Sequence, residues 1–156
     1  MTDEQQESPG GGGVRLPPSM RDRIPFLLYR AAETSHALAN AMLAPLGLIA
    51  RQAGILTLVT EMEPMTQKRL GDLLRIDRTT MVGLLDDLED QGYVRRTRHP
   101  VDRRAYLIHP TETGHAAKAE AVRILDEQQR LFLSPLEAAE RQQLLSLLIR
   151  LQQPPA

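Results

Sequence analysis

The sequence predicts a mostly α-helical protein with a small β wing, and three features of the sequence predict this fold class. Apolar residues recur at helical spacing in most segments between residues 24 and 151. Two β-rich segments, YVRRTR and RAYLIH, flank the residues HPVDR and predict a hairpin. Aromatic residues make up only 3% of the 156 residues, so the predicted core is aliphatic. A chain of this length is expected to form one compact domain with a core of its own.

The central segment, residues 66–110, begins with two predicted helices joined by a tight turn of four residues. Apolar residues share one face of each helix, as Leu70, Leu73 and Leu74 in the first and as Met81, Leu84, Leu85 and Leu88 in the second. Thr66 and Asp77 precede the two helices and are predicted to cap them. Gly92 follows the second helix, where a left-handed residue is expected. The pattern is typical of a helix-turn-helix.

The predicted hairpin that follows is strongly basic. Between residues 95 and 104 five arginines stand against Asp102, a net charge of +4 that leaves −5 for the rest of a chain whose total is −1. The five are Arg95, Arg96, Arg98, Arg103 and Arg104. A concentrated basic loop on an otherwise acidic chain indicates a polyanionic partner. The segment is therefore interpreted as a winged helix-turn-helix, at about residues 49–110; a merely solvated basic loop is the alternative.

Long helices are predicted on both sides of this winged unit. Residues 1–18, acidic and then glycine-rich, are expected to be a disordered tail, and Ser19 is expected to cap a helix reaching about residue 45. A second helix is expected at about 49–61. Thr111 should cap a long helix after the hairpin, and Ser134-Pro135-Leu136-Glu137 is a start signal for the last one.

The terminal helices, about 19–45 and 111–153, carry apolar stripes that the winged unit does not need. We interpret them as dimerisation helices within a single domain at 19–153; their folding back as a bundle within one chain is the alternative. A twofold pair would match a palindromic site whose half-sites lie about one helical turn apart.

Several classes of function are disfavoured. The sequence has no cysteine, so disulfides, thiolate metal sites and cysteine-based peroxide sensing are excluded. The longest apolar run, AMLAPLGLIA, is too short to span a bilayer, and no signal pattern opens the chain, so a cytoplasmic protein without a membrane partner is expected. The histidines (His36, His99, His109 and His115) lack metal-ligand spacing. No phosphate loop or nucleophile motif occurs, so no metal, cofactor or enzymatic activity is expected.

Four acids gather near the end of the second helix, at Asp86, Asp87, Glu89 and Asp90. Paired carboxylates can perform hydrolysis, but no metal ligand or base lies nearby in the sequence. We expect a structural role for them, pairing with Arg95 or Arg96.

The sequence resembles the MarR family of bacterial transcriptional regulators over about residues 20–152. The resemblance rests on TQKRLGDLLRIDRTTMVGLLDDLEDQGYV, on RHPVDRRAYLIHPTETG and on SPLEAAERQQLLSLLIRL. It implies a homodimer with interlocking terminal helices, and repression that ends when a small aromatic or phenolic ligand binds. The chain departs from the family pattern at Val82-Gly83, where an arginine is usual, and at Pro110, where a leucine is usual.

Candidate contacts to double-stranded DNA follow from these motifs. Arg78, Thr79 and Thr80 open the presumed reading helix, where N–H groups and a partial positive charge suit phosphate or base edges. Gln67 and Lys68 open the preceding helix and should contact the DNA backbone, together with Arg69.

In the wing, Arg98 is the expected phosphate contact. The resemblance implies that Asp102 pairs with Arg104 to hold the wing in shape while Arg103 enters a minor groove. Tyr29 and His36 could line an effector pocket, although packed or surface roles are the alternative.

The favoured function is a homodimeric, sequence-specific repressor that binds a palindromic operator and is relieved by a small ligand. The alternative is a winged protein-interaction or dimerisation module without specific DNA binding, and an enzyme comes third.

Overall fold

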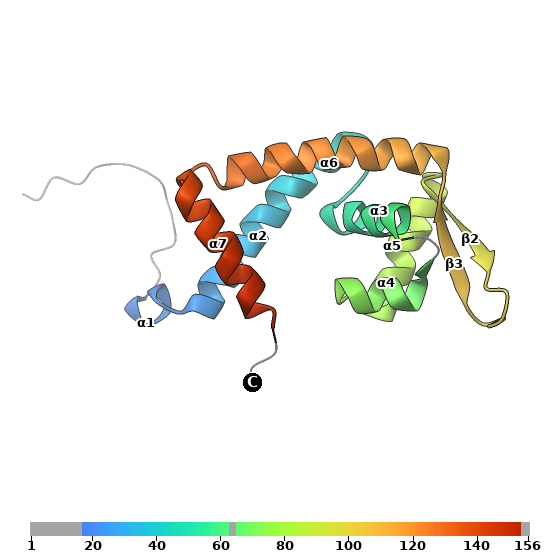
Figure 1. The fold of residues 1–156 in the computed structure, drawn as a ribbon, viewed down its shortest axis with the longest axis horizontal. Coiled ribbons are helices and arrows are strands. Elements are labelled where there is room, and N and C mark those ends of the chain that lie inside the picture. Colours follow the sequence, from blue (N-terminus) through green and yellow to red (C-terminus); the bar gives the residue numbers. More distant parts are fainter. Residues whose placement is uncertain (1–16, 63–64, 154–156) are drawn as a thin grey trace, which may run out of the picture. The chain divides into compact units, whose positions relative to one another are not determined.

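The computed structural model describes residues 17–62 and 65–153. Contacts within the chain separate two units, residues 1–33 and 34–156, and each is described by itself. The first contains α1 (Pro18–Arg21) and the beginning of α2 (Ile24–Leu43); the expected single domain at 19–153 stays a prediction. The second unit continues with η1 (Ala44–Leu46), α3 (Ala50–Glu61), β1 (Met65–Thr66), α4 (Gln67–Leu74), α5 (Arg78–Asp90), β2 (Val94–Arg98), β3 (Tyr106–Pro110), α6 (Glu112–Phe132) and α7 (Ala138–Leu151) (Figure 1).

The first predicted helix is interrupted. The prediction of one helix capped by Ser19 was wrong, because α1 begins at Pro18, with Pro17 at its N-cap, and ends before Asp22. Pro25 occupies the first turn of α2, a position where its missing N–H costs nothing, and this favours a new helix start there. Pro18 lies in α1 rather than in the predicted tail, and residues 1–16 of that tail lie outside the described residues.

The predicted helix-turn-helix is confirmed, with α4 and α5 joined by residues 75–77, one residue fewer than expected. The Thr66 hydroxyl accepts the Arg69 N–H at 3.2 Å, and the Asp77 carboxylate accepts the Thr80 N–H at 3.0 Å, so both predicted caps form. Arg75, in the left-handed conformation (φ 53°), ends α4. Gly92, with φ 73°, is also left-handed as expected.

The predicted hairpin is also confirmed, but it belongs to a three-stranded antiparallel sheet in the order β1-β3-β2. β2 and β3 pair from Val94 with Pro110 to Arg98 with Tyr106. β1 was not predicted, because two residues are too few to show an alternating pattern.

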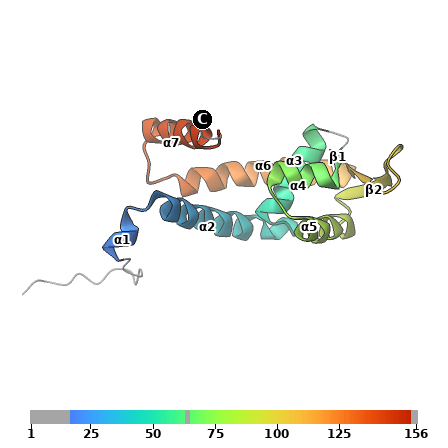
Figure 2. The same ribbon diagram turned by 90° about the horizontal axis from the view of Figure 1, so that it is seen from below.

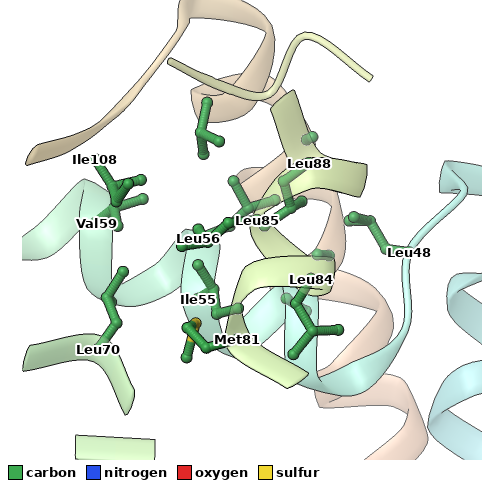
Figure 3. Close-up of a cluster of buried hydrophobic side chains, with 14 of the residues drawn as sticks. Leu48, Ile55, Leu56, Val59, Leu70, Met81, Leu84, Leu85, Leu88 and Ile108 are labelled. Atoms are coloured by element: carbon green, nitrogen blue, oxygen red, sulfur yellow. The ribbon is translucent and has the colours of Figure 1, made fainter. Parts of the chain in front are cut away.

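The core lies among α3, α4, α5 and the sheet (Figure 3). All four predicted apolar residues of α5 are buried, namely Met81, Leu84, Leu85 and Leu88. On α4, Leu70 is fully buried, whereas Leu73 is 48% exposed and contributes little to the core. Each fully buried leucine contributes about 2 kcal/mol relative to an exposed one, so this face fixes α5 on the unit while its opposite face stays in solvent.

α6 begins, as predicted, with Thr111, whose hydroxyl accepts the Gly114 N–H at 3.0 Å. Figures 1 and 2 show α6 as one unbroken helix running from the wing hairpin to the turn before α7. The predicted start of the last helix was wrong: residues 134–136 form a turn, and α7 begins after Glu137, whose N–H is accepted by the Glu140 carboxylate at 2.8 Å. The start signal thus lies one turn further along the chain than Ser134-Pro135 indicated.

The other end of α6 is joined to the second half of α2. The buried side chain of Gln128 donates to the carbonyl and hydroxyl oxygens of Ser35, each at 3.2 Å.

Within the described ranges no single helix is long and apolar enough to cross a membrane, while the bent pair 24–46 and 50–61 passes that test together by length and composition.

Candidate nucleic-acid interface

The start of α5 presents the first group of predicted contact residues. Arg78 and Thr79 are exposed, and Thr80 is half-buried. The Thr80 hydroxyl donates to the Asp77 carboxylate at 2.6 Å, and this bond, with the one from the Thr80 backbone N–H, lowers the pKa of Asp77 below its ordinary value. Asp77 therefore stays ionised while it caps the helix, and Arg78 and Thr79 project from a helix end of positive polarity.

The start of α4 presents the second group. Lys68 and Arg69 are exposed and Gln67 is half-buried, all in the first turn after the Thr66 cap. α4 and α5 pack directly against each other, so both helix starts belong to the same winged unit.

The wing tip, defined here as residues 99–105, is braced by several hydrogen bonds. His99 and Ala105 close it, with the His99 N–H donating to the Ala105 carbonyl at 3.1 Å. The Asp102 carboxylate accepts the backbone N–H of Arg104 at 3.0 Å, so the contact between these two predicted partners runs through the main chain. Arg98, which precedes the wing tip on β2, donates from its guanidinium to the Arg103 carbonyl within the tip at 2.9 Å.

Arg98 is also stacked on an aromatic ring. Its guanidinium carbon lies 5.1 Å from the centre of the Tyr106 ring, opposite it across the β2–β3 pair. Arg98 is thus partly occupied in shaping the wing. By contrast, the exposed guanidinium groups of Arg103 and Arg104 make no hydrogen bond or ion pair within the described part of the chain.

The acid cluster at the end of α5 is tied to the wing by Arg96. Its guanidinium lies 2.6 Å from carboxylate oxygens of both Asp86 and Glu89, and its backbone N–H donates to Glu89 at 3.1 Å. Burial alone would lower the pKa of Arg96, but the hydrogen bonds and charges of the two carboxylates outweigh it and raise that pKa. The predicted pairing is therefore made by Arg96, and it joins α5 to strand β2.

A third member of the cluster reaches another helix. Asp87 accepts a hydrogen bond at 3.4 Å from the buried side chain of Gln52 on α3. Across the described residues no group of three or more histidine, cysteine, aspartate or glutamate side chains is placed to hold a metal ion. Three acids of α5 thus hold this helix to β2 and α3.

Comparisons with known proteins agree with this geometry. The family model described as "MarR family" matches residues 46–105, which cover most of the winged unit. The organic hydroperoxide resistance transcriptional regulator of Bacillus subtilis is 32% identical over 105 residues, which cover 67% of this chain and 71% of that protein. The chain belongs to the MarR family of transcriptional regulators.

Solved structures of this family share the fold. CouR from Rhodococcus jostii RHA1, bound to p-coumaroyl-CoA, is 30% identical, with a TM-score of 0.75 over 90% of this chain and 99% of CouR. A mutant MarR from E. coli complexed with operator DNA is 26% identical, with a TM-score of 0.75 over 83% of this chain and 95% of that one.

The chain spans 59% of the length of another relative, a putative transcriptional regulatory protein of Thauera aromatica.

The two departures from the MarR pattern have clear places in the structure. Val82 and Gly83 are both exposed on α5, and a Cβ atom added at Gly83 would meet nothing within 4 Å. Pro110 is buried at the end of β3, opposite Val94. Thr111 then makes the connection to α6. Its hydroxyl donates to the Gly92 carbonyl at 2.6 Å, and its backbone N–H donates to the Tyr93 carbonyl at 3.0 Å.

The two residues predicted for an effector pocket are described in separate units. Tyr29, in the first, is 60% exposed and donates to Glu33 at 2.7 Å, a hydrogen bond that raises the pKa of Tyr29. His36, in the second, lines a cleft of about 260 Å³ together with Asn40, Ile49, Ala50 and Arg51.

Sequence reasoning missed the contributions of His99 and Tyr106 to the wing. Both contacts depend on how the wing tip folds back on itself. No spacing rule in the sequence reports that conformation, although a histidine followed by proline at the end of a strand marks where the turn begins.

Proposed function

We propose that this protein is a ligand-relieved repressor that binds a palindromic operator as a homodimer. One observation carries the proposal: one winged unit exposes both the positive end of α5 and an arginine-bearing wing, the two parts with which a winged helix-turn-helix meets DNA. Membership of a family of regulators supports a cytoplasmic, non-enzymatic role.

The proposed contacts are divided by their position on the unit. Arg78, Thr79 and Thr80 face the major groove at the start of α5, where the threonine methyl groups can touch thymine. Gln67 and Lys68, at the start of α4, meet the phosphate backbone.

The wing supplies the other proposed contacts. Arg98 contacts phosphate from strand β2, and Arg103 and Arg104 reach the adjacent minor groove, while Asp102 shapes the wing.

The proposed homodimer is supported by apolar side chains that one chain leaves in solvent. On α7 these are Leu145, Leu147, Ile149 and Leu151, which are 44–66% exposed. A cleft of about 620 Å³ between the end of α6 and α7 is lined by five leucines and Phe132 together with polar and charged side chains, and a helix of a second copy could bind there.

The proposed effector is a small aromatic or phenolic acid. CouR was solved with p-coumaroyl-CoA, a thioester whose acyl part is phenolic, which supports recognition of a phenolic group by a relative. In this chain the cleft beside His36 also holds Arg51, so it combines hydrogen-bonding and cationic groups that would suit a carboxylate.

The test is the salt dependence of DNA binding, measured on a duplex selected by the wild-type protein from a random-sequence pool. Changing Arg103 and Arg104 together to alanine should weaken binding and flatten the plot of log affinity against log salt by about one unit per lost phosphate contact. Arg123→Ala, which removes an exposed arginine of α6 that pairs with Glu120, is the matched control and should leave the slope unchanged. An unchanged slope for the double variant, or binding no tighter than non-specific, would instead support the protein-interaction module.

A further inference from the structure

The wing tip is more ordered than its exposure suggests. Besides the His99–Ala105 hydrogen bond that closes it, the Ala105 N–H donates back to the Asp102 carbonyl at 3.0 Å. Two main-chain hydrogen bonds at Ala105 therefore hold the turn, one to His99 and one to Asp102. What remains to be fixed is the outward stretch, residues 100–104, which carries the two arginines proposed to reach DNA.

The side chain of His99 fixes that stretch from inside. Its Nδ1 atom lies 3.0 Å from the backbone nitrogen of Asp102 and 3.3 Å from that of Val101, and it accepts hydrogen bonds from both. A ring nitrogen accepts a hydrogen bond through its free lone pair, so it is Nδ1 of His99 that serves as the acceptor for both N–H groups. The ring is half-buried beneath the turn that it holds.

The hydrogen bonds then continue toward the arginines. Asp102, held at its N–H by His99, uses its carboxylate to accept the N–H of Arg104, and the carbonyl of Arg103 is held by Arg98. Each link fixes the backbone of one residue, and the last two residues fixed are those whose side chains extend into solvent.

We propose that His99 is a positioning residue for DNA binding, which orders the wing tip before binding so that Arg103 and Arg104 already point at the minor groove. The inference rests on the proposed function of the wing. Its physical basis is preorganisation: a loop that is already ordered loses less conformational entropy on binding than one that must order on the DNA. His99 needs no contact with the DNA to have this effect.

The experiment compares two substitutions at this position. His99→Ala removes the acceptor, whereas His99→Asn places an amide oxygen close to the position of Nδ1 and can still accept from the two N–H groups. His109→Ala is the matched control, because it removes another histidine of the same hairpin, bonded to Thr97 at 2.9 Å and away from the tip. The probe is the selected duplex, titrated at several salt concentrations.

The expected result separates positioning from contact. His99→Ala should raise Kd roughly threefold to thirtyfold at every salt concentration, the scale of one or two lost hydrogen bonds, and leave the salt slope unchanged. His99→Asn and His109→Ala should stay within about twofold of wild type. In the free protein, amide hydrogen exchange at Val101 and Asp102 should accelerate in His99→Ala only.

Different failures have different meanings. If the double arginine variant keeps the wild-type slope, the proposed function of the wing fails. If that variant flattens the slope but His99→Ala binds like wild type, the positioning role is overturned. A slope that His99→Ala flattens by a full unit would make His99 a phosphate contact, and an Asn variant as weak as Ala would show that the acceptor is not what matters.

Discussion

At the scale of single residues, close approaches of the backbone decide which positions tolerate change. Gly114, in the first turn of α6, lies so near Tyr93 that an added Cβ would stand 2.0 Å from the Tyr93 carbonyl oxygen. The same carbonyl accepts the Thr111 N–H, so the first turn of α6 packs directly against the backbone at the start of the wing. Only a residue without a side chain permits this close contact.

Gly114→Ala is therefore expected to lower the free energy of unfolding by about 1–3 kcal/mol or more, since backbone must move to admit the methyl group. The matched control is Gly83→Ala, in the middle of α5, where an added Cβ meets nothing within 4 Å. That change should raise stability by about 0.5–1 kcal/mol through helix propensity. Urea unfolding at one fixed protein concentration measures the stability of both variants. Equal stability of the two would contradict the close contact between Gly114 and the Tyr93 carbonyl.

At the scale of the elements, the caps of the winged unit could be predicted from sequence because each is a local arrangement of a few residues. Thr66, Asp77 and Thr111 each accept an N–H three residues later, which the pattern of residue types already indicates. Asp77 is the most consequential, because it begins the helix proposed to read DNA.

The cap at Asp77 predicts a particular dependence of stability on pH. Its pKa is lowered in the folded protein, so its stabilising effect is complete above the pKa of an unfolded aspartate, near 4. It is lost as the pH falls through the lower, folded value. The stability difference between wild type and Asp77→Ala should stay constant from about pH 7 to pH 5 and shrink below about pH 4.

The control for this cap is Asp77→Asn, which keeps a capping oxygen without the charge. Its stability relative to Asp77→Ala should show no such decline at low pH. Chemical unfolding of the three proteins between about pH 3 and pH 7 measures the difference. A wild-type advantage over Asp77→Ala that grows as the pH falls would contradict the direction of the pKa change.

The elements that sequence reasoning missed depend on tertiary contacts. Ser134-Pro135 matches a helix start, yet α7 starts at Ala138, because Glu140 satisfies the N–H of Glu137. β1 is ordered only by pairing with β3. In the candidate interface, residue types and charge predicted which groups are exposed, but the bonds of His99 and Arg98 within the wing follow from a loop conformation that no periodicity encodes.

At the scale of the whole molecule, the elements differ in what they expose. The net charge of the chain is −1, yet the wing and the starts of α4 and α5 carry exposed arginine and lysine side chains. Four large apolar side chains are exposed along α7, and α2 exposes others, Ile24 and Leu27 among them. A regulator that binds both a second copy and DNA needs exposed groups of both kinds.

In the proposed complex, two copies of this chain place their α5 helices in successive major grooves of one duplex. The most direct measurement is the mass of the complex with the selected duplex by multi-angle light scattering, together with hydroxyl-radical footprinting of the same complex. Two chains per duplex and two protected half-sites centred about 10 base pairs apart are expected. One chain per duplex with a single protected patch, or a protein that stays monomeric at micromolar concentration, would contradict it.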